Sequence, residues 1–261
     1  MIQRMLSSAM FAGCAAGLLA VLLHFAFVER LILIGEQYES GELVHFQGAD
    51  GHHDDHAMAA EGGTPQAMDQ PTTEAAPTDA ASSHAGHDGH GSGEDASPLK
   101  RHSLTVLFAA LIYSGFALLL VSAYALAGQF GQKITTRDGL LWGLAGFVAL
   151  QLAPAIGLSP ELPGTMGAAL EARQLWWVGT AIATASGLGL LAFGRTAVVW
   201  VVGLILLAAP HIIGAPEVSG FSGVAPPELA AGFAARSLGV GLCAWVFLGG
   251  FLAHLWQDKT A

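Results

Sequence analysis

The chain has 261 residues, of which 53% are hydrophobic and only 11% are charged. A water-soluble domain would carry roughly a quarter charged residues, so this composition argues against a soluble globular protein and indicates a membrane protein. The net charge is −10 at pH 7. The sequence has no basic patch, which argues against nucleic acid as a partner.

Six apolar segments are each close to the ~20 residues that a bilayer-spanning helix needs. We therefore predict an all-α polytopic membrane protein, a bundle of about six transmembrane helices with one long disordered His-rich loop. Merging or demoting one segment would leave five. Only Arg195 separates the fourth and fifth segments, which requires a tight helical hairpin. The predicted spans are residues 5–28, 103–128, 139–157, 172–194, 196–214 and 228–256.

Three regions follow from the composition. Residues 1–46 hold the first transmembrane helix and a juxtamembrane amphipathic segment, in which Leu31, Ile34 and Tyr38 form a partial helical stripe. The apolar run of the first transmembrane helix is longer than the ~7–15 residues of a signal peptide core, which favours a retained helix over a cleaved signal peptide. Residues 47–98 have almost no large apolar side chains, so we predict a disordered loop. Residues 99–261 form a five-helix membrane domain.

The predicted loop contains two histidine clusters, which hold six of the eleven histidines of the chain. Residues 50–56 read Asp-Gly-His-His-Asp-Asp-His, and residues 84–90 read His-Ala-Gly-His-Asp-Gly-His. Neutral imidazole and carboxylate are ligands for Co, Ni, Zn and Cu, and His-rich tracts are associated with metal binding. The alternative is a solvated, low-complexity spacer that happens to be rich in histidine. The candidate ligands are His52, His53, His56, His84, His87 and His90.

The basic residues favour an orientation with both termini in the cytoplasm, which makes the loop extracytoplasmic. The cytoplasmic side would receive Arg4, Lys133, Arg137, Arg195 and Lys259. The outer side would receive Arg30, Lys100, Arg101 and Arg173, three of them on the long loop, where they count weakly in this rule.

A second set of candidate ligands lies where the predicted spans reach the outer surface. Polar residues at such depths are costly and tend to be functional. For each of them the alternative is an interhelical hydrogen bond or an interfacial side chain that reaches water. Their shared depth favours a metal entry site. The set is His24, His102, His211, Glu161 and Glu217.

The middle of the predicted membrane region is poor in polar groups. A polar path there would have only Gln151, Arg236 and the carbonyls freed by Pro154 and Pro210. We expect Arg236 to form a structural ion pair. Glycines recur in the spans and predict close helix packing. They include Gly143, Gly146, Gly187, Gly189, Gly239, Gly241, Gly249 and Gly250.

Motifs of nucleotide-dependent and hydrolytic enzymes are missing from the sequence. It contains no GxxxxGK[ST] phosphate loop, no HExxH zinc motif and no nucleophile elbow. We therefore predict that the protein is not an enzyme and uses no nucleotide.

Short motifs cover most of the chain outside the loop: VERLIL at 28–33, EQYE at 36–39, WGLAGF at 142–147, LAPAIGL at 152–158, PELPG at 160–164, ARQLWW at 172–177 and PHIIGAP at 210–216. Together they resemble the CbtA-type cobalt transporter subunits of bacteria. The resemblance implies an inner-membrane protein with five or six spans. It also implies a small single-span, His-bearing CbtB-type partner subunit and a link to cobalt supply for cobalamin.

The resemblance and the loop favour uptake of a divalent metal across the bacterial inner membrane, with the loop capturing the metal. Cobalt is the expected metal, and nickel, zinc and copper are alternatives. The metal would be a substrate, and membrane lipid would surround the helices. Two other functions stay open. The protein could buffer or sense metal at the membrane without transport, or it could export cobalt or nickel.

Overall fold

The computed structural model describes residues 2–44, 97–217 and 223–257. All regular elements in these residues are helical, which confirms the predicted all-α class; Thr165 and Gly223 form an isolated bridge. The predicted loop 47–98 lies outside the described residues except for its last two positions. The helices are α1 (Ile2–Phe27), α2 (Glu29–Glu39), α3 (Pro98–Gln129), α4 (Thr136–Phe147), α5 (Ala153–Gly157), α6 (Leu170–Phe193), α7 (Ala197–Ile213) and α8 (Pro227–Gln257), with a π-helical turn η1 (Val148–Leu152) between α4 and α5.

Five helical segments in the described residues are long and apolar enough to cross a membrane, and α7 is a shorter apolar helix of 17 residues. The five are Met5–Phe27, Leu99–Gln129, Thr136–Gly157, Leu170–Phe193 and Pro227–Gln257. At a rise of ~1.5 Å per residue, α7 is about 25 Å long, close to the ~30 Å hydrocarbon core of a bilayer. The prediction of about six spans is therefore confirmed, with five long helices and one short helix. The chain is a multi-pass membrane protein.

Side-chain caps and a short turn set several helix boundaries. Helix α4 begins after Thr135, which forms a capping box with Asp138. Helix α7 begins after Thr196, whose hydroxyl accepts a hydrogen bond from the backbone N–H of Val199. Residues 194–196 alone separate α6 from α7, so the predicted tight hairpin at Arg195 is confirmed.

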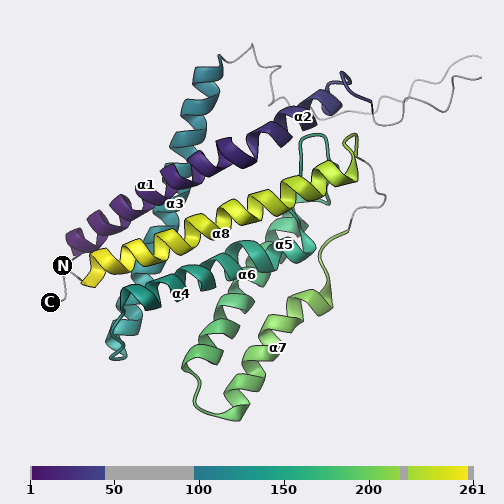
Figure 1. Ribbon diagram of the computed structural model, residues 1–261. Helices are drawn as coiled ribbons and strands as arrows, with labels where there is room; N and C mark the ends of the chain where they lie inside the picture. Colours follow the sequence, from purple (N-terminus) through teal and green to yellow (C-terminus); the bar gives the residue numbers. More distant parts are fainter. Residues whose placement is uncertain (1, 45–96, 218–222, 258–261) are drawn as a thin grey trace, which may run out of the picture. The chain divides into compact units, whose positions relative to one another are not determined.

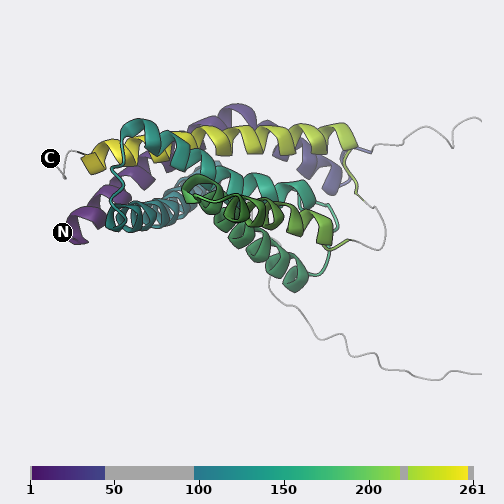
Figure 2. The same ribbon diagram turned by 90° about the horizontal axis from the view of Figure 1, so that it is seen from below.

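Helices α1 and α8 lie antiparallel beside each other, and α8 also packs against α4 (Figure 1). Phe11 of α1 contacts Phe251 near the end of α8, with ring centroids 5.9 Å apart. Helix α3 packs across α1, and the α6–α7 hairpin lies on the side of α4 away from α1. Seen from below, α8 runs lengthwise with α2 near its beginning (Figure 2).

Glycines allow the backbones of neighbouring helices to approach closely. A Cβ atom on Gly13 of α1 would lie 2.4 Å from the Cα of Ser114 in α3, and one on Gly17 would lie 2.9 Å from the Cα of Ala110. On α4, a Cβ on Gly143 would lie 2.3 Å from the carbonyl oxygen of Trp245 in α8. Both helix pairs therefore use small residues spaced by four, the packing mode expected between membrane helices.

The chain bends at Val28, after which α2 continues as a separate helix. Gly35 of α2 packs against Leu162 in the segment that follows α5. We call this side of the domain the α2 end. Helices α1, α5 and α7 finish there, and α3, α6 and α8 start there.

Candidate functional site

All five outer candidate residues lie at the α2 end, but they occupy separate places. His102, in the first turns of α3, has its Nδ1 atom 3.4 Å from a carboxylate oxygen of Glu29. The ring of Phe25 lies against His102 at 4.9 Å and against His24 at 6.0 Å between centroids. His24 and His102 thus flank the ring of Phe25, where α1 ends, and the carboxylate of Glu29 lies beside His102.

The other three candidates lie nearer to α6 and α7. Glu161 accepts a hydrogen bond from Arg173, with 2.7 Å between Oε2 and the guanidinium nitrogen. His211 lies edge-on to the indole of Trp176, with 6.5 Å between ring centroids. Glu217 is exposed in the segment that follows α7. The Glu161 carboxylate is therefore already neutralised by a cation, and His211 has an aromatic neighbour.

Within the described ranges, no group of three or more His, Cys, Asp or Glu side chains is arranged to hold a metal ion. The loop candidates His52, His53, His56, His84, His87 and His90 lie outside these ranges. The closest approach to a ligand set is the His102–Glu29 pair, which offers one imidazole and one carboxylate. A divalent ion bound there would need further ligands from water or from elsewhere in the chain.

An ion pair joins the two helices that flank the loop. The guanidinium of Arg101 in α3 donates two hydrogen bonds to the carboxylate of Glu36 in α2, at 2.8 and 3.2 Å. Both side chains are about two-fifths exposed, so we expect a small contribution to stability. The pair joins α2 to the beginning of α3 at the α2 end.

Two cavities enter the helical domain near this end. The first, about 790 Å³, lies between α5, α6 and α8 and begins beside Glu161 and Arg173. The second, about 580 Å³, lies between α1, α3 and α8 and is lined by His24 and Tyr113. Gln151 and Ser237 line both cavities, so these two side chains lie between the two spaces.

Gln151 owes its position to a break in the α-helical pattern. Pro154 has no N–H and cannot donate to the carbonyl of Leu150, and the backbone widens into the π-helical turn η1 just before it. Within this turn the N–H of Ala153 donates to the carbonyl of Val148, five residues earlier. The turn sets Gln151 toward α8, where Gly241 leaves space for the amide.

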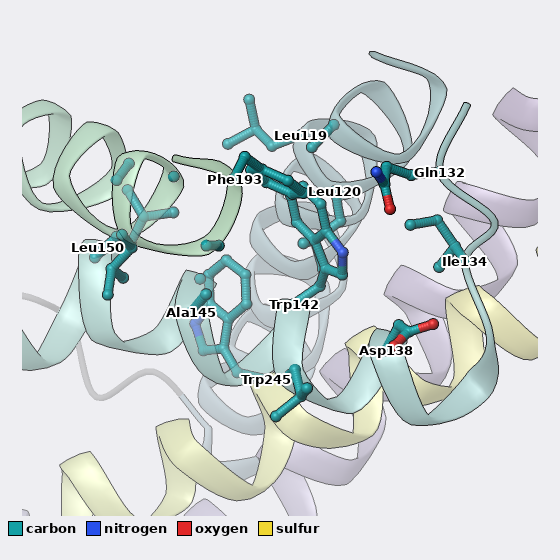
Figure 3. A pocket seen from close by; sticks show the side chains of 18 of the residues that line it. Leu119, Leu120, Gln132, Ile134, Asp138, Trp142, Ala145, Leu150, Phe193 and Trp245 are labelled. Carbon is teal, nitrogen blue, oxygen red and sulfur yellow. The ribbon is translucent and has the colours of Figure 1, made fainter. Parts of the chain in front are cut away.

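The third cavity differs in chemistry from these two. It encloses about 570 Å³ between α3, α4 and α6, and most of its walls are apolar side chains such as Leu119, Trp142 and Phe193 (Figure 3). Asp138 lies at its edge, where its carboxylate caps α4 through Thr135. The mostly apolar lining of this cavity suits a hydrocarbon group and provides no set of metal ligands.

A family model described as "probable cobalt transporter subunit (CbtA)" matches residues 2–257, which is nearly the whole chain. The chain belongs to this family. No curated protein and no solved structure matches it. Membership of the CbtA family confirms the resemblance carried by the short sequence motifs. It also identifies a transporter family rather than an enzyme family, and names cobalt as the metal of that family.

The sequence indicates Gln151 as a polar residue within the membrane but gives no sign of Ser237, which lines the same two cavities. The available signal was one amide in an apolar run, three residues before Pro154. Arg236 was expected to form an ion pair; in the structure its guanidinium donates to the main-chain carbonyl of Phe27 at 3.2 Å. This contact ties α8 to the end of α1, beside the cavity that holds His24.

Proposed function

We propose that the protein takes up a divalent metal, with cobalt as its main substrate, across the bacterial inner membrane. The observation that carries this proposal is membership of the CbtA family over residues 2–257. Multiple apolar helices and cavities lined by histidine and carboxylate support it. The proposal includes the orientation predicted from the basic residues, with both termini in the cytoplasm and the loop outside.

The His-rich loop captures metal in this proposal. Six histidines interleaved with aspartates provide imidazole and carboxylate ligands suited to Co²⁺, and also to Ni²⁺, Zn²⁺ and Cu²⁺. A tethered chelator raises the concentration of metal near the membrane surface without adding to the architecture of the helices. The Arg101–Glu36 ion pair joins the helices that precede and follow the loop in the sequence, and it lies at the α2 end with the proposed entry residues.

Metal would pass from the loop to the residues at the α2 end. His102 and Glu29 provide a first partial ligand pair, and His24 and Glu161 line the two cavities. His211 and Glu217 would contribute from the side of α7. The proposed partner is a small single-span subunit of the CbtB type, as the family resemblance implies.

Deletion of residues 48–97 tests the role of the loop. We expect the deletion protein to fold and to transport cobalt at abundant metal, but to accumulate less than the wild type when cobalt is scarce. A matched control replaces the six loop histidines with serine while keeping the loop length. Loss of uptake at saturating cobalt in the deletion would show that the loop is part of the path itself.

A further inference from the structure

Two side chains separate the cavities that enter the domain from the α2 end. Gln151 of η1 and Ser237 of α8 line both spaces, while every other residue lines only one of them. Gln151 lies six residues before Gly157, about 9 Å along the helix from the α2 end. It is therefore within the membrane-spanning part of the domain and not at its surface.

The amide of Gln151 has an unused acceptor. Its Oε1 atom is buried and receives no hydrogen bond from the described residues. A buried amide oxygen without a donor costs free energy, more so within a membrane, where water does not replace the missing donor. Polar groups kept at such depth tend to have a function.

The opposite helix makes room for this oxygen. A Cβ atom on Gly241 of α8 would lie 2.1 Å from Oε1 of Gln151, so any larger residue at this position forces the amide to move. Two residues earlier, Gly239 has nothing within 4 Å of a built Cβ. Gly241 therefore lies against the amide, whereas Gly239 does not.

The two cavities differ in the metal-ligating side chains that line them. The first cavity has the carboxylate of Glu161, paired with the guanidinium of Arg173, near the α2 end, and the second has the imidazole of His24. The second cavity continues to Tyr113 and Phe116 of α3. Glu161 and His24 both stand near the α2 end, and Gln151 and Ser237 lie deeper in the domain than either of them.

We propose that Gln151 and Ser237 form an intramembrane binding position for a divalent cation, at the junction of the two cavities. The inference rests on the proposed transport function and assigns it a position inside the membrane. The amide oxygen and the hydroxyl replace part of the hydration shell of the ion, as oxygen dipoles do in ion-conducting filters. Gly241 is a positioning residue, because the lack of a side chain there lets the amide keep its place between the two cavities.

The test compares initial rates of cobalt uptake in cells that lack their own copy of the gene and express single variants. Gln151→Met keeps the length of the side chain but removes the oxygen. We expect it to lower uptake by about tenfold or more at saturating cobalt, equivalent to about 1.4 kcal/mol in the barrier. Gln151→Glu keeps an oxygen ligand and should still transport, with a lower KM for cobalt.

Gly241→Ala and Gly239→Ala form a matched pair. The first places a methyl group against the amide oxygen and should impair uptake, and the second fills open space and should leave uptake unchanged. If Gln151→Met does not accumulate as a folded protein, this pair decides. A purely structural role for Gln151 predicts no change in KM or in the ratio of cobalt to zinc uptake among folded variants.

Normal uptake by Gln151→Met, or equal uptake by the two glycine variants, would overturn the binding position and leave the proposed function intact. Uptake by the wild type no faster than by cells without the gene would overturn the proposed function and the binding position with it.

Discussion

The contact between α4 and α8 at Gly143 gives a quantitative prediction about stability. A Cβ on Gly143 would lie 2.3 Å from the carbonyl oxygen of Trp245 and 3.2 Å from the Cα of Gly249. Ordinary contact for a Cβ begins at 3.4 Å. Because the obstructing atoms belong to the backbone, Gly143→Ala requires the two helices to separate by about 1 Å. Overpacking of this kind costs about 1–3 kcal/mol.

A matched glycine isolates the steric cost. Gly115, inside α3, has nothing within 4 Å of a built Cβ. Alanine is favoured over glycine in a helix by about 0.8–1 kcal/mol, and both substitutions receive this benefit. We therefore expect Gly143→Ala to be less stable than Gly115→Ala by the overpacking term alone, about 1–3 kcal/mol.

The assay is reversible unfolding of the two variants and the wild type in mixed detergent micelles, followed by the fluorescence of the tryptophans. Trp245 and Trp142 lie at or near the α4–α8 contact, so the signal reports on this interface. Equal free energies of unfolding for Gly143→Ala and Gly115→Ala would refute the close approach of the two helices.

Three further results are expected. Tyr124→Phe removes a buried hydrogen bond of 3.0 Å from α3 to the Gly249 carbonyl of α8, and should lower the free energy of unfolding by about 1 kcal/mol. Glu36→Gln breaks an exposed pair with Arg101 and should cost less than about 1 kcal/mol in the same measurement. A peptide of residues 48–97 should lose affinity for cobalt in titration calorimetry between about pH 7 and pH 5, because metal binds neutral imidazole and the histidines gain protons as the pH falls; constant affinity would assign the binding to carboxylates.

Substitution of His211 tests the proposed entry site on the side of α7. With the loop intact, we expect His211→Ala to abolish cobalt passage while expression stays near normal. If the ring only packs against Trp176, its loss costs about a kcal/mol of stability and leaves uptake unchanged. Uptake by His211→Ala and His211→Gln, measured with protein amounts matched, distinguishes the two roles.

The helices could be predicted from the sequence because apolar length is a local property. The six predicted spans coincide with helices in the structure, and most boundaries differ by a few residues. The largest difference is at α3, which starts at Pro98 and not at residue 103. The additional residues at this end include Arg101 and His102, which pair with Glu36 and Glu29 of the preceding helix.

The packing partners of individual glycines could not be predicted in the same way. Gly187 and Gly241 face neighbouring helices, while Gly189 and Gly239, two residues away in each case, face open space. Two residues span about 200° of a helix, so one glycine of such a pair points away from the contact. Which one does so depends on the rotation of each helix, and that is set by helices distant in the sequence.

The candidate site was predictable only in part for a similar reason. The outer histidines and glutamates stand at the ends of apolar runs, which places them near the membrane surface. The pairing of Glu161 with Arg173 depends on the order in which α5, α6 and α8 pack. The same order decides that Gln151 and Ser237 line the same two cavities. No local pattern encodes that order.

Cobalt uptake is measured by the initial rate at which radioactive cobalt enters cells with and without the gene at trace metal concentration. We expect faster entry when the gene is present, with cobalt recovered inside the cytoplasm. Equal entry with more cobalt retained at the membrane would indicate buffering, and lower internal cobalt would indicate efflux. Either result would rule out cobalt uptake by this protein.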